Sequence, residues 1–442
     1  MQIKKIIIPL GISALFITLS NPAFASAFQS FEQNASGLGN AYSGMAAIAD
    51  DATTEFYNPA GLTRIKRQEV DVSTVVADAS SDFTATRATS NSQNVLTSPG
   101  THIKSNPLGM SPLPAVHYAK PLMDNLVFGF GITIPFGLET DYGDDSAARY
   151  MATDSKIITV NISPSLAYQI TEKLSVGAGL DAQYITAELD QQVDPSQFLG
   201  GAPTTANDLT MKNSADDWGF GWNAGILYQF SPHTRAGLSY RSSVKHSPSG
   251  KSKVTYPNTL DPSVDIPILE ANGLKDGNVS TDMTLPETAT LSLYHEFTSR
   301  WAAMASATFT HWQRFKKLTL HFTGGLADTS VIENFHDTLR YAAGVNYRVN
   351  KKLLLRAGAA YDESPTNSAR RTIRLPDADR QWLSLGAHYE FNKHASLDAG
   401  GAYIHIDKGT VSQTGLLGAD IDGKFRHTCA GLFGAQFNWV FG

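Results

Sequence analysis

The feature that most constrains the fold is a two-residue alternation of apolar and polar side chains, which recurs along the chain up to its last residues. In the stretch 234–241, Leu238 and Tyr240 share one face, whereas Arg235 and Arg241 share the other. Successive side chains of a β-strand point to opposite faces. One apolar face against lipid and one mixed face against a lumen is typical of a membrane β-barrel. A soluble β-sandwich shows the same alternation.

Counting such stretches predicts an all-β transmembrane fold with about fourteen antiparallel strands. An even number is expected for a barrel made from one bacterial chain. Tight turns such as 170–173 and 391–394 alternate with long polar stretches such as 190–215 and 246–284, which we expect outside the cell. The expected strands lie near residues 69–80, 111–120, 125–135, 156–170, 173–189, 216–230, 233–245, 285–297, 300–320, 336–349, 352–362, 380–391, 394–407 and 423–441.

The first 25 residues favour the barrel over the sandwich because they have the order of a secretory signal peptide. Two lysines precede the apolar run 6–19, and Ala23-Phe24-Ala25 has the small-x-small pattern of a cleavage site. The run is short of the ~20 residues that a membrane helix needs. We expect cleavage after Ala25, with Ala27 as the alternative. The domains are then the signal peptide 1–25, a plug-like segment 26–68 and a barrel 69–442.

Composition excludes several other classes of protein. A hydrophobic content of 42% fits a barrel whose strands are apolar on alternate residues only. The net charge of −6 gives no indication of nucleic-acid binding. Cys429 is the single cysteine, so an intrachain disulfide is impossible and a disulfide-stabilised scaffold is excluded.

Several blocks of sequence, in order, resemble the FadL/TodX family of outer-membrane transporters of long-chain fatty acids and aromatic hydrocarbons. Each block is weak alone, and their number and order make the match specific across nearly the whole mature chain. The blocks are Ala27-Phe28-Gln29, Ser36 to Gly44 (SGLGNAYSG), Ala47 to Ala52 (AIADDA), Asn58-Pro59-Ala60, Gly131 to Leu138 (GITIPFGL), Leu285-Pro286-Glu287, Trp312 with Phe315, Asp362 to Pro365 (DESP) and Ile373 to Asp377 (IRLPD).

The resemblance implies a fourteen-stranded barrel in the outer membrane of a Gram-negative bacterium, with the N-terminal segment folded inside as a hatch. It also implies a route for substrate, from the extracellular loops to a hydrophobic pocket and then sideways through a gap made by a kink in the third strand. Transport would be facilitated diffusion of long-chain fatty acids or similar hydrophobic molecules. Aromatic hydrocarbons are the alternative substrates within the family.

Two motifs fall in the expected hatch. Asn58 suits a helix cap and Pro59 the first helical position, so Asn58-Pro59-Ala60 predicts a helix start. The resemblance places this motif at the centre of a hatch that moves. Gly37, Gly39 and Gly44 are expected to pack in a narrow lumen, since no strand precedes them and no lysine ends a phosphate-binding loop.

The lateral gate is expected at Gly129, Gly131 and Pro135. Proline cannot donate to a strand ladder, and strand glycines often mark bulges. A break here leaves backbone groups unpaired, and lipid would not tolerate them unless something local satisfied them. A turn mistaken for a strand is the alternative interpretation.

A fatty acid requires an apolar slot with a cationic or hydrogen-bonding end. The basic head-group residues of the family are replaced here by Val331, Glu333 and Thr186 in a rough alignment. Candidate replacements that face the lumen are Arg235, Arg241, Arg340, Arg356 and Arg380, although each could serve only to balance lumenal acids.

Two other functions compete with transport of hydrophobic molecules. A general porin would have an open polar lumen and no plug, and an outer-membrane lipase would need a Ser-His pair that no motif selects. We expect no enzyme activity, no cofactor and no metal site. The expected partners are the hydrophobic substrate, outer-membrane lipid with lipopolysaccharide, and the barrel-assembly machinery, which would recognise the aromatic C-terminal strand; the chain is expected to be a monomer. That strand alternates Phe433, Phe437, Trp439 and Phe441.

Overall fold

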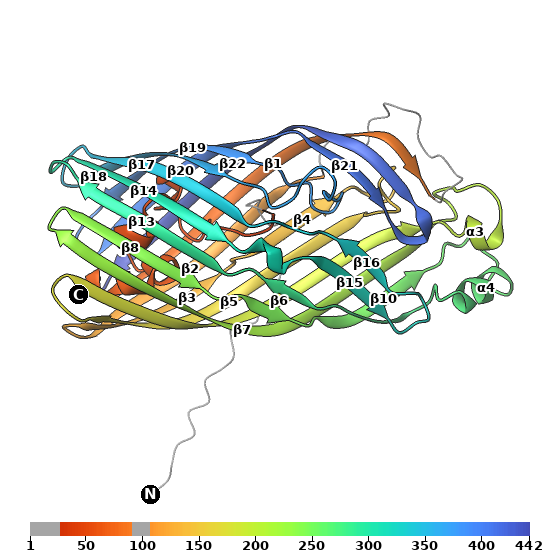
Figure 1. The fold of residues 1–442 in the computed structure, drawn as a ribbon, viewed down its shortest axis with the longest axis horizontal. Helices are drawn as coiled ribbons and strands as arrows, with labels where there is room; N and C mark the ends of the chain where they lie inside the picture. The colour runs from red at the N-terminus through yellow and green to blue at the C-terminus, as the bar shows by residue number, and fades with distance from the viewer. Residues whose placement is uncertain (1–26, 91–106) are drawn as a thin grey trace, which may run out of the picture.

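The computed structural model describes residues 27–90 and 107–442 as one closed β-barrel (Figure 1). Fourteen strands form the wall, each antiparallel to both neighbours, and the first strand, β1, pairs with the last, β22. Closure joins the first strand to the last, so the sheet has no terminal edge strand, as strands that cross a membrane require. The predicted fold and strand number are confirmed.

The wall strands follow one another around the barrel in chain order. They are β1 (Glu69–Thr89), β2 (Met110–Met123), β3 (Leu126–Thr133), β5 (Asp154–Gln169), β6 (Leu174–Val193), β7 (Leu209–Ser231), β8 (Thr234–Arg241), β13 (Thr288–Glu296), β14 (Trp301–Thr310), β17 (Thr338–Arg348), β18 (Leu353–Asp362), β19 (Arg380–Glu390), β20 (Ala395–Ile406) and β22 (Asp420–Val440).

Shorter strands extend the wall or form hairpins at one end. They are β4 (Gly137–Asp141), β9 (Val244–His246), β10 (Ser249–Thr255), β11 (Gly277–Ser280), β12 (Met283–Leu285), β15 (Lys317–Phe322), β16 (Thr329–Ile332) and β21 (Gly409–Thr414). The helices are η1 (Leu38–Asn40), α1 (Met45–Ile48), α2 (Thr54–Tyr57), η2 (Pro59–Arg64), α3 (Ser196–Leu199), α4 (Asp265–Ala271), η3 (Trp312–Arg314) and η4 (Leu416–Gly418). None of the helices within the described residues has the length and hydropathy that a membrane crossing requires.

The apolar face of the alternation points outward. Leu238 and Tyr240 of β8 are exposed, whereas Arg235 of the same strand is buried in the interior. The exposed set on the other strands is large and rich in aromatic rings, and it includes Leu166, Leu180, Trp218, Phe220, Trp222, Phe230, Leu293, Phe297, Trp301, Leu383, Leu385, Phe433, Phe437 and Trp439. An outward apolar band with aromatic residues is the surface that a barrel presents to lipid.

The two rims differ as expected. Short turns and the C-terminus occupy one rim, and longer segments with α3 and α4 project from the other end (Figure 1). The stretches 190–215 and 246–284, expected as loops, are partly strand, because β6, β7 and β10 continue beyond the wall. The predicted signal peptide lies outside the described residues.

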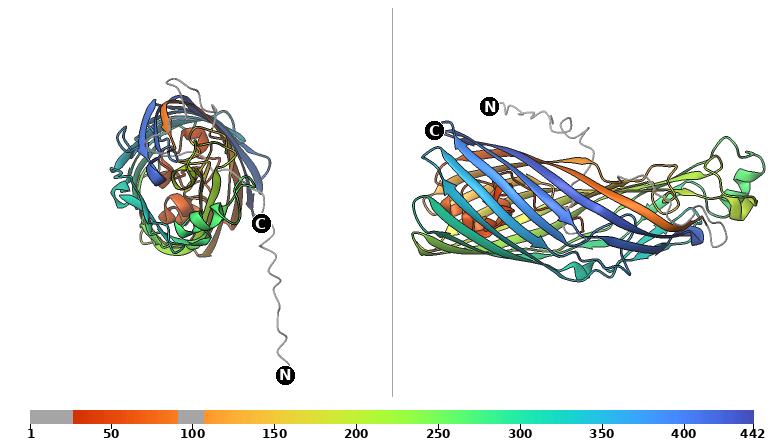
Figure 2. Two further views of the ribbon diagram at one scale, coloured as in Figure 1. Left: turned by 90° about the vertical axis from the view of Figure 1, so that its right-hand side faces the viewer. Right: turned by 90° about the horizontal axis from the view of Figure 1, so that it is seen from above.

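The segment from Ala27 to Arg64 lies inside the barrel near the short-turn rim, and we call it the hatch (Figure 2). Its helix η2 packs against β5, β6 and β7, α1 packs against β8 and β13, and η1 packs against β17 to β20. The hatch therefore touches most of the wall.

Candidate functional site

Asn58 anchors the middle of the hatch. Its Oδ1 accepts a hydrogen bond from the Ala60 amide at 3.1 Å, and Pro59 opens helix η2, so the predicted cap is confirmed. Its Nδ2 donates to Ala46 O at 2.6 Å, inside the hatch, and to Ile226 O at 3.1 Å, on β7. One buried amide thus caps a helix and joins two parts of the hatch to the wall.

Three wall glycines make room for this motif. A Cβ at Gly177 would overlap the Ala60 amide nitrogen, and one at Gly225 would overlap Asn58 Oδ1. A Cβ at Gly237 would overlap Ala46 O. These glycines lie on the adjacent strands β6, β7 and β8. The wall is therefore shaped to the hatch at this place.

The three hatch glycines 37, 39 and 44 are closely surrounded by other atoms. A Cβ at Gly39 would lie 2.9 Å from Gly386 Cα, which is backbone against backbone. Gly44 has φ +71 and would meet Met304 Cβ at 2.5 Å. A Cβ at Gly37 would crowd Asn34 and Tyr42 within the hatch itself.

The wall has a gap beside the third strand. The ladder between β2 and β3 ends at Val116 and Ile132, yet β2 continues to pair with β1 as far as Met110. Strand β4 pairs with β5 and with no other strand in the described part of the chain. The half of β2 before Val116 and the strand β4 therefore face each other without a ladder between them.

An extra residue causes this gap. Thr133 pairs with Asn161 and Gly137 pairs with Ile158. Three residues (134, 135 and 136) therefore stand opposite two (159 and 160), which is the pattern of a β-bulge. Pro135 lies at its centre, as expected.

Gly129 and Gly131 do not make the break. Both pair regularly with β2 and with β5, so the expectation that they mark a bulge is wrong. A Cβ at Gly129 would lie 2.6 Å from Leu62 Cδ1, and one at Gly131 would overlap Glu55 Oε2. The two glycines leave room for the hatch side chains Leu62 and Glu55 against β3.

The hatch completes the hydrogen bonds of the broken strand. Ile134 N donates to Gln33 Oε1 and Gln33 Nε2 donates to Ile134 O, both at 2.8 Å. Ser30 N donates to Pro135 O, and Gly137 N donates to Phe28 O, again at 2.8 Å. Lipid cannot satisfy such groups, so the N-terminal segment takes the place of the missing strand.

An apolar cluster adjoins the gap. The ring of Phe28 lies 5.1 Å from that of Trp312, 5.6 Å from Phe315 and 5.9 Å from Phe136, measured between ring centres. Phe335 packs against Trp312 and Phe315 on the other side. Phe28 thus fills an aromatic site with rings from the hatch, the bulge and the loops.

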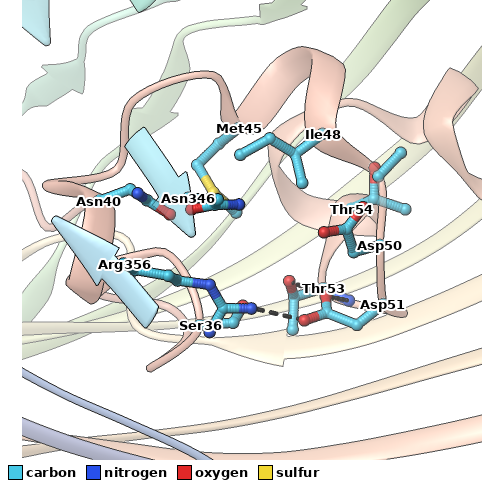
Figure 3. A pocket seen from close by; sticks show the side chains of 11 residues that line it. Ser36, Asn40, Met45, Ile48, Asp50, Asp51, Thr53, Thr54, Asn346 and Arg356 are labelled. Carbon is cyan, nitrogen blue, oxygen red and sulfur yellow. Dashed lines mark hydrogen bonds between the residues drawn. The ribbon is translucent and has the colours of Figure 1, made fainter. Parts of the chain in front are cut away.

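The cavities here are small. The one beside the bulge measures about 60 Å³ and is lined in part by Phe31, Phe56, Pro135 and Arg241. A second, between the hatch and strands β17 and β18, measures about 20 Å³ (Figure 3). Such volumes hold a few water molecules and no long acyl chain. A polar mouth of about 490 Å³ opens between the hatch and the short-turn rim.

Asp51 lines the cavity between the hatch and strands β17 and β18, and it links the hatch to the wall (Figure 3). Its carboxylate accepts hydrogen bonds from Ser36 Oγ at 2.9 Å and from Gln436 Nε2 at 3.0 Å. Gln436 Oε1 in turn accepts from the amides of Ala35 and Ser36. This part of the hatch is bound to β22.

All five arginines proposed for the head group face inward, and each has a protein partner. Arg235 donates to Ala47 O and Ile48 O, both at 2.6 Å, and Arg340 donates to Ala41 O at 2.8 Å. The other three form ion pairs, namely Arg241 with Asp181, Arg356 with Asp398 and Arg380 with Asp377. Arg241 also borders the cavity beside the bulge. A substrate carboxylate would have to compete with these partners.

Two buried carboxyl groups stand out. Burial raises the pKa of Glu32, which lies in the hatch, although the hydrogen bond from Ser30 and the charges of Arg340 and Arg380 act in the opposite direction. Burial alone raises the pKa of Glu333, in the loop before β17, to about 8. Glu333 Oε2 has no hydrogen-bond partner among the described residues, so nothing offsets its desolvation.

The sequence interpretation missed several residues of this site. They are Gln33, Glu55, His117 and the glycines of β6 to β8. An inward glycine on three adjacent strands was visible as a pattern. Gln33 and Glu55 carried no signal, because the partners of their side chains lie on strands that only the closed barrel brings near.

Comparison with known proteins agrees with the architecture. Residues 16–441 match the family described as outer membrane protein transport protein (OMPP1/FadL/TodX). A long-chain fatty acid transport protein of Escherichia coli O6:H1 is 33% identical, with 96% of each chain covered. Outer membrane protein P1 of Haemophilus influenzae is 31% identical, covering 95% of this chain and 96% of the relative.

Solved structures share the fold. A Pseudomonas aeruginosa FadL homologue superposes with a TM-score of 0.84 at 24% identity, covering 94% of this chain and all of that one. The Pseudomonas putida toluene transporter TodX gives a TM-score of 0.69 at 17% identity, with 94% and 100% covered. With the closed barrel, its apolar girdle and the match over nearly its whole length, the chain belongs to the OMPP1/FadL/TodX family of outer membrane transport proteins.

Proposed function

We propose that this barrel carries long-chain fatty acids, or similar hydrophobic molecules, across the outer membrane by facilitated diffusion. The observation that carries the proposal is the wall gap at Ile134 to Phe136, which the hatch covers on the inside. A hydrophobic molecule in the lumen can leave through such a gap into the lipid without crossing the periplasm. A polar solute would gain nothing from that exit.

The aromatic cluster supplies the apolar site. An apolar substrate that entered it would compete with Phe28 for the rings of Trp312 and Phe315. Gly137 N is bonded to Phe28 O, so displacement of Phe28 would pull on the cover of the gap. Hatch rearrangement at Asn58-Pro59-Ala60 and lateral exit at the bulge centred on Pro135, beyond the regularly paired Gly129 and Gly131, are parts of this proposal.

The site also indicates a head-group residue and a second class of substrate. Arg241 is the first choice for the head group because it borders the cavity beside the bulge. Aromatic-hydrocarbon uptake is the second candidate, because the cluster is made of rings and all five arginines are engaged. Recognition of the last strand by the assembly machinery, contact with lipopolysaccharide and a monomeric state complete the proposal.

Growth on oleate as sole carbon source tests the substrate. A strain without this gene should grow poorly, and the wild-type gene should restore growth. Mass spectrometry of lipid that co-purifies with the barrel should find acyl chains. Normal uptake of oleate by the deletion strain, with no apolar ligand bound to the purified barrel, would overturn the proposal. Binding of toluene but not oleate would select the aromatic alternative.

A further inference from the structure

A series of buried polar contacts joins the hatch to the wall beside the gap. Glu55, on α2, is fully buried and accepts a hydrogen bond from Ser163 Oγ on β5 through its Oε1. Its Oε2 lies 3.3 Å from His117 Nδ1 on β2. It sits against β3 at Gly131, where any Cβ would overlap it. One hatch side chain thus contacts β2, β3 and β5. These strands are neighbours in the wall (Figure 1).

The series of polar contacts continues to the bulge. His117 Nε2 lies 3.2 Å from Gln33 O, which also accepts from Ser73 Oγ at 3.3 Å. The side-chain amide of Gln33 holds the backbone of Ile134 at 2.8 Å on both its N–H and its C=O. Ser163, Glu55, His117, Gln33 and Ile134 therefore form one connected series.

The histidine fixes the protons in this series. A carbonyl oxygen only accepts, so the Nε2 that faces Gln33 O carries a hydrogen. The other ring nitrogen faces Glu55 Oε2, and that contact is attractive only if one proton lies between the two groups. A glutamine at position 55 would supply that hydrogen from its amide and would still accept from Ser163.

We propose that Glu55 and His117 form a latch that positions Gln33 over the bulge, so that the gap in the wall opens only when this series separates. Glu55 is a positioning residue, because it acts on the exit through His117 and Gln33. The latch rests on the proposed lateral exit. Breaking a fully buried, charge-assisted series is costly, since each group left behind loses its partner without gaining water.

A thiol at the gap measures the opening directly. Ala115 is buried and lies on the stretch of β2 that pairs with β1 on one side and has no partner strand on the side of the gap. The test protein carries Ala115→Cys together with Cys429→Ser, so that it holds one thiol. Its rate of reaction with a lipid-soluble maleimide, in purified protein in vesicles, reports how often the gap is open. Heat-dependent mobility on gels shows that each variant is folded.

Four variants separate a latch from mere packing. Glu55→Ala should raise the labelling rate roughly tenfold, the factor that corresponds to about 1.4 kcal/mol. Glu55→Gln should label like the parent. Thr63→Ala, which removes a buried hatch-to-wall hydrogen bond to Ser175 far from the gap, should also label like the parent. Glu55→Ala with Gly131→Ala fills the vacated space without restoring the series, so its labelling should stay fast.

A parental rate for Glu55→Ala would overturn the latch, and so would a parental rate for the double variant, because packing alone would then close the gap. Fast labelling of Thr63→Ala would show general loosening of the hatch instead. Labelling needs no substrate, so a barrel that fails to take up oleate can still show the latch, and the two proposals fail separately.

Discussion

At the scale of the residue, a few buried side chains do the work that backbone ladders do elsewhere. Gln33 pairs with the backbone of Ile134 as a neighbouring strand would, with both bonds at 2.8 Å. Asn58 caps η2 and reaches the backbone of β7. Because each amide offers a donor and an acceptor, a side chain can replace a strand where the chain cannot supply one.

Glu333 leads to a prediction about pH. The folded chain holds its proton up to about pH 8, whereas an unfolded chain releases it near 4.5. Protonated Glu333 therefore contributes fully to the free energy of unfolding below about pH 4.5. That contribution falls as the pH rises and is lost once the pH has passed about 8, at no more than about 1.4 kcal/mol per pH unit. Thermal unfolding should show Glu333→Gln losing less stability than the wild type between about pH 5 and about pH 9. Equal losses in the two proteins would contradict the assignment.

At the scale of the element, the break in the third strand is a matter of residue count. Strand β3 and strand β4 both pair with β5, but the two registers differ by one residue. The bulge turns β4 away from β2 and leaves the gap. Pro135 suits this place because it has no N–H to leave unpaired.

Deletion of Pro135 should therefore close the gap. With one residue removed, two residues stand opposite two, and the strand can continue in register beside β2. Uptake of oleate should fall to the level of the deletion strain, although the barrel still assembles. Pro135→Ala is the matched control, because it keeps the residue count, and it should retain most of the uptake. Full uptake of oleate by a folded barrel that lacks Pro135 would place the exit elsewhere.

At the scale of the whole molecule, the barrel is a wall built around its own first segment. The hatch touches the wall so closely that no side chain fits at Gly177, Gly225 or Gly237. Arg235 on β8 and Arg340 on β17 both donate to hatch carbonyls. The hatch is thus held by many contacts, and the cavities beside the bulge and beside Asp51 are too small for a long acyl chain.

The closed hatch predicts an electrically silent barrel. In a planar bilayer the wild-type protein should carry little ion current, whereas removal of residues 28–64 should give a steady conductance through the emptied lumen. The closed wall needs no hatch to satisfy its strand ladders outside the bulge, so the variant should still fold. Steady conductance by the wild type, equal to that of the variant, would favour the general porin.

The sequence by itself determined the elements. Two-residue periodicity is a local property, so the amino-acid order alone predicted the fourteen strands, their outward faces and the short-turn rim. The cap at Asn58 was local too, because it depends on the two residues that follow. The family resemblance added the placement of the N-terminal segment inside the lumen and the lateral exit at a kinked third strand.

Only the tertiary structure decided what those elements do to each other. Glu55 meets Ser163 across 108 positions of sequence, and Gln33 meets Ile134 across 101. No periodicity records such pairs, since closure of the barrel alone brings them together. The same is true of Gly131, whose lack of a side chain looks like a bulge in sequence and proves to be the space for Glu55. Local patterns determine the strands, and contacts across the lumen determine how the hatch covers the gap.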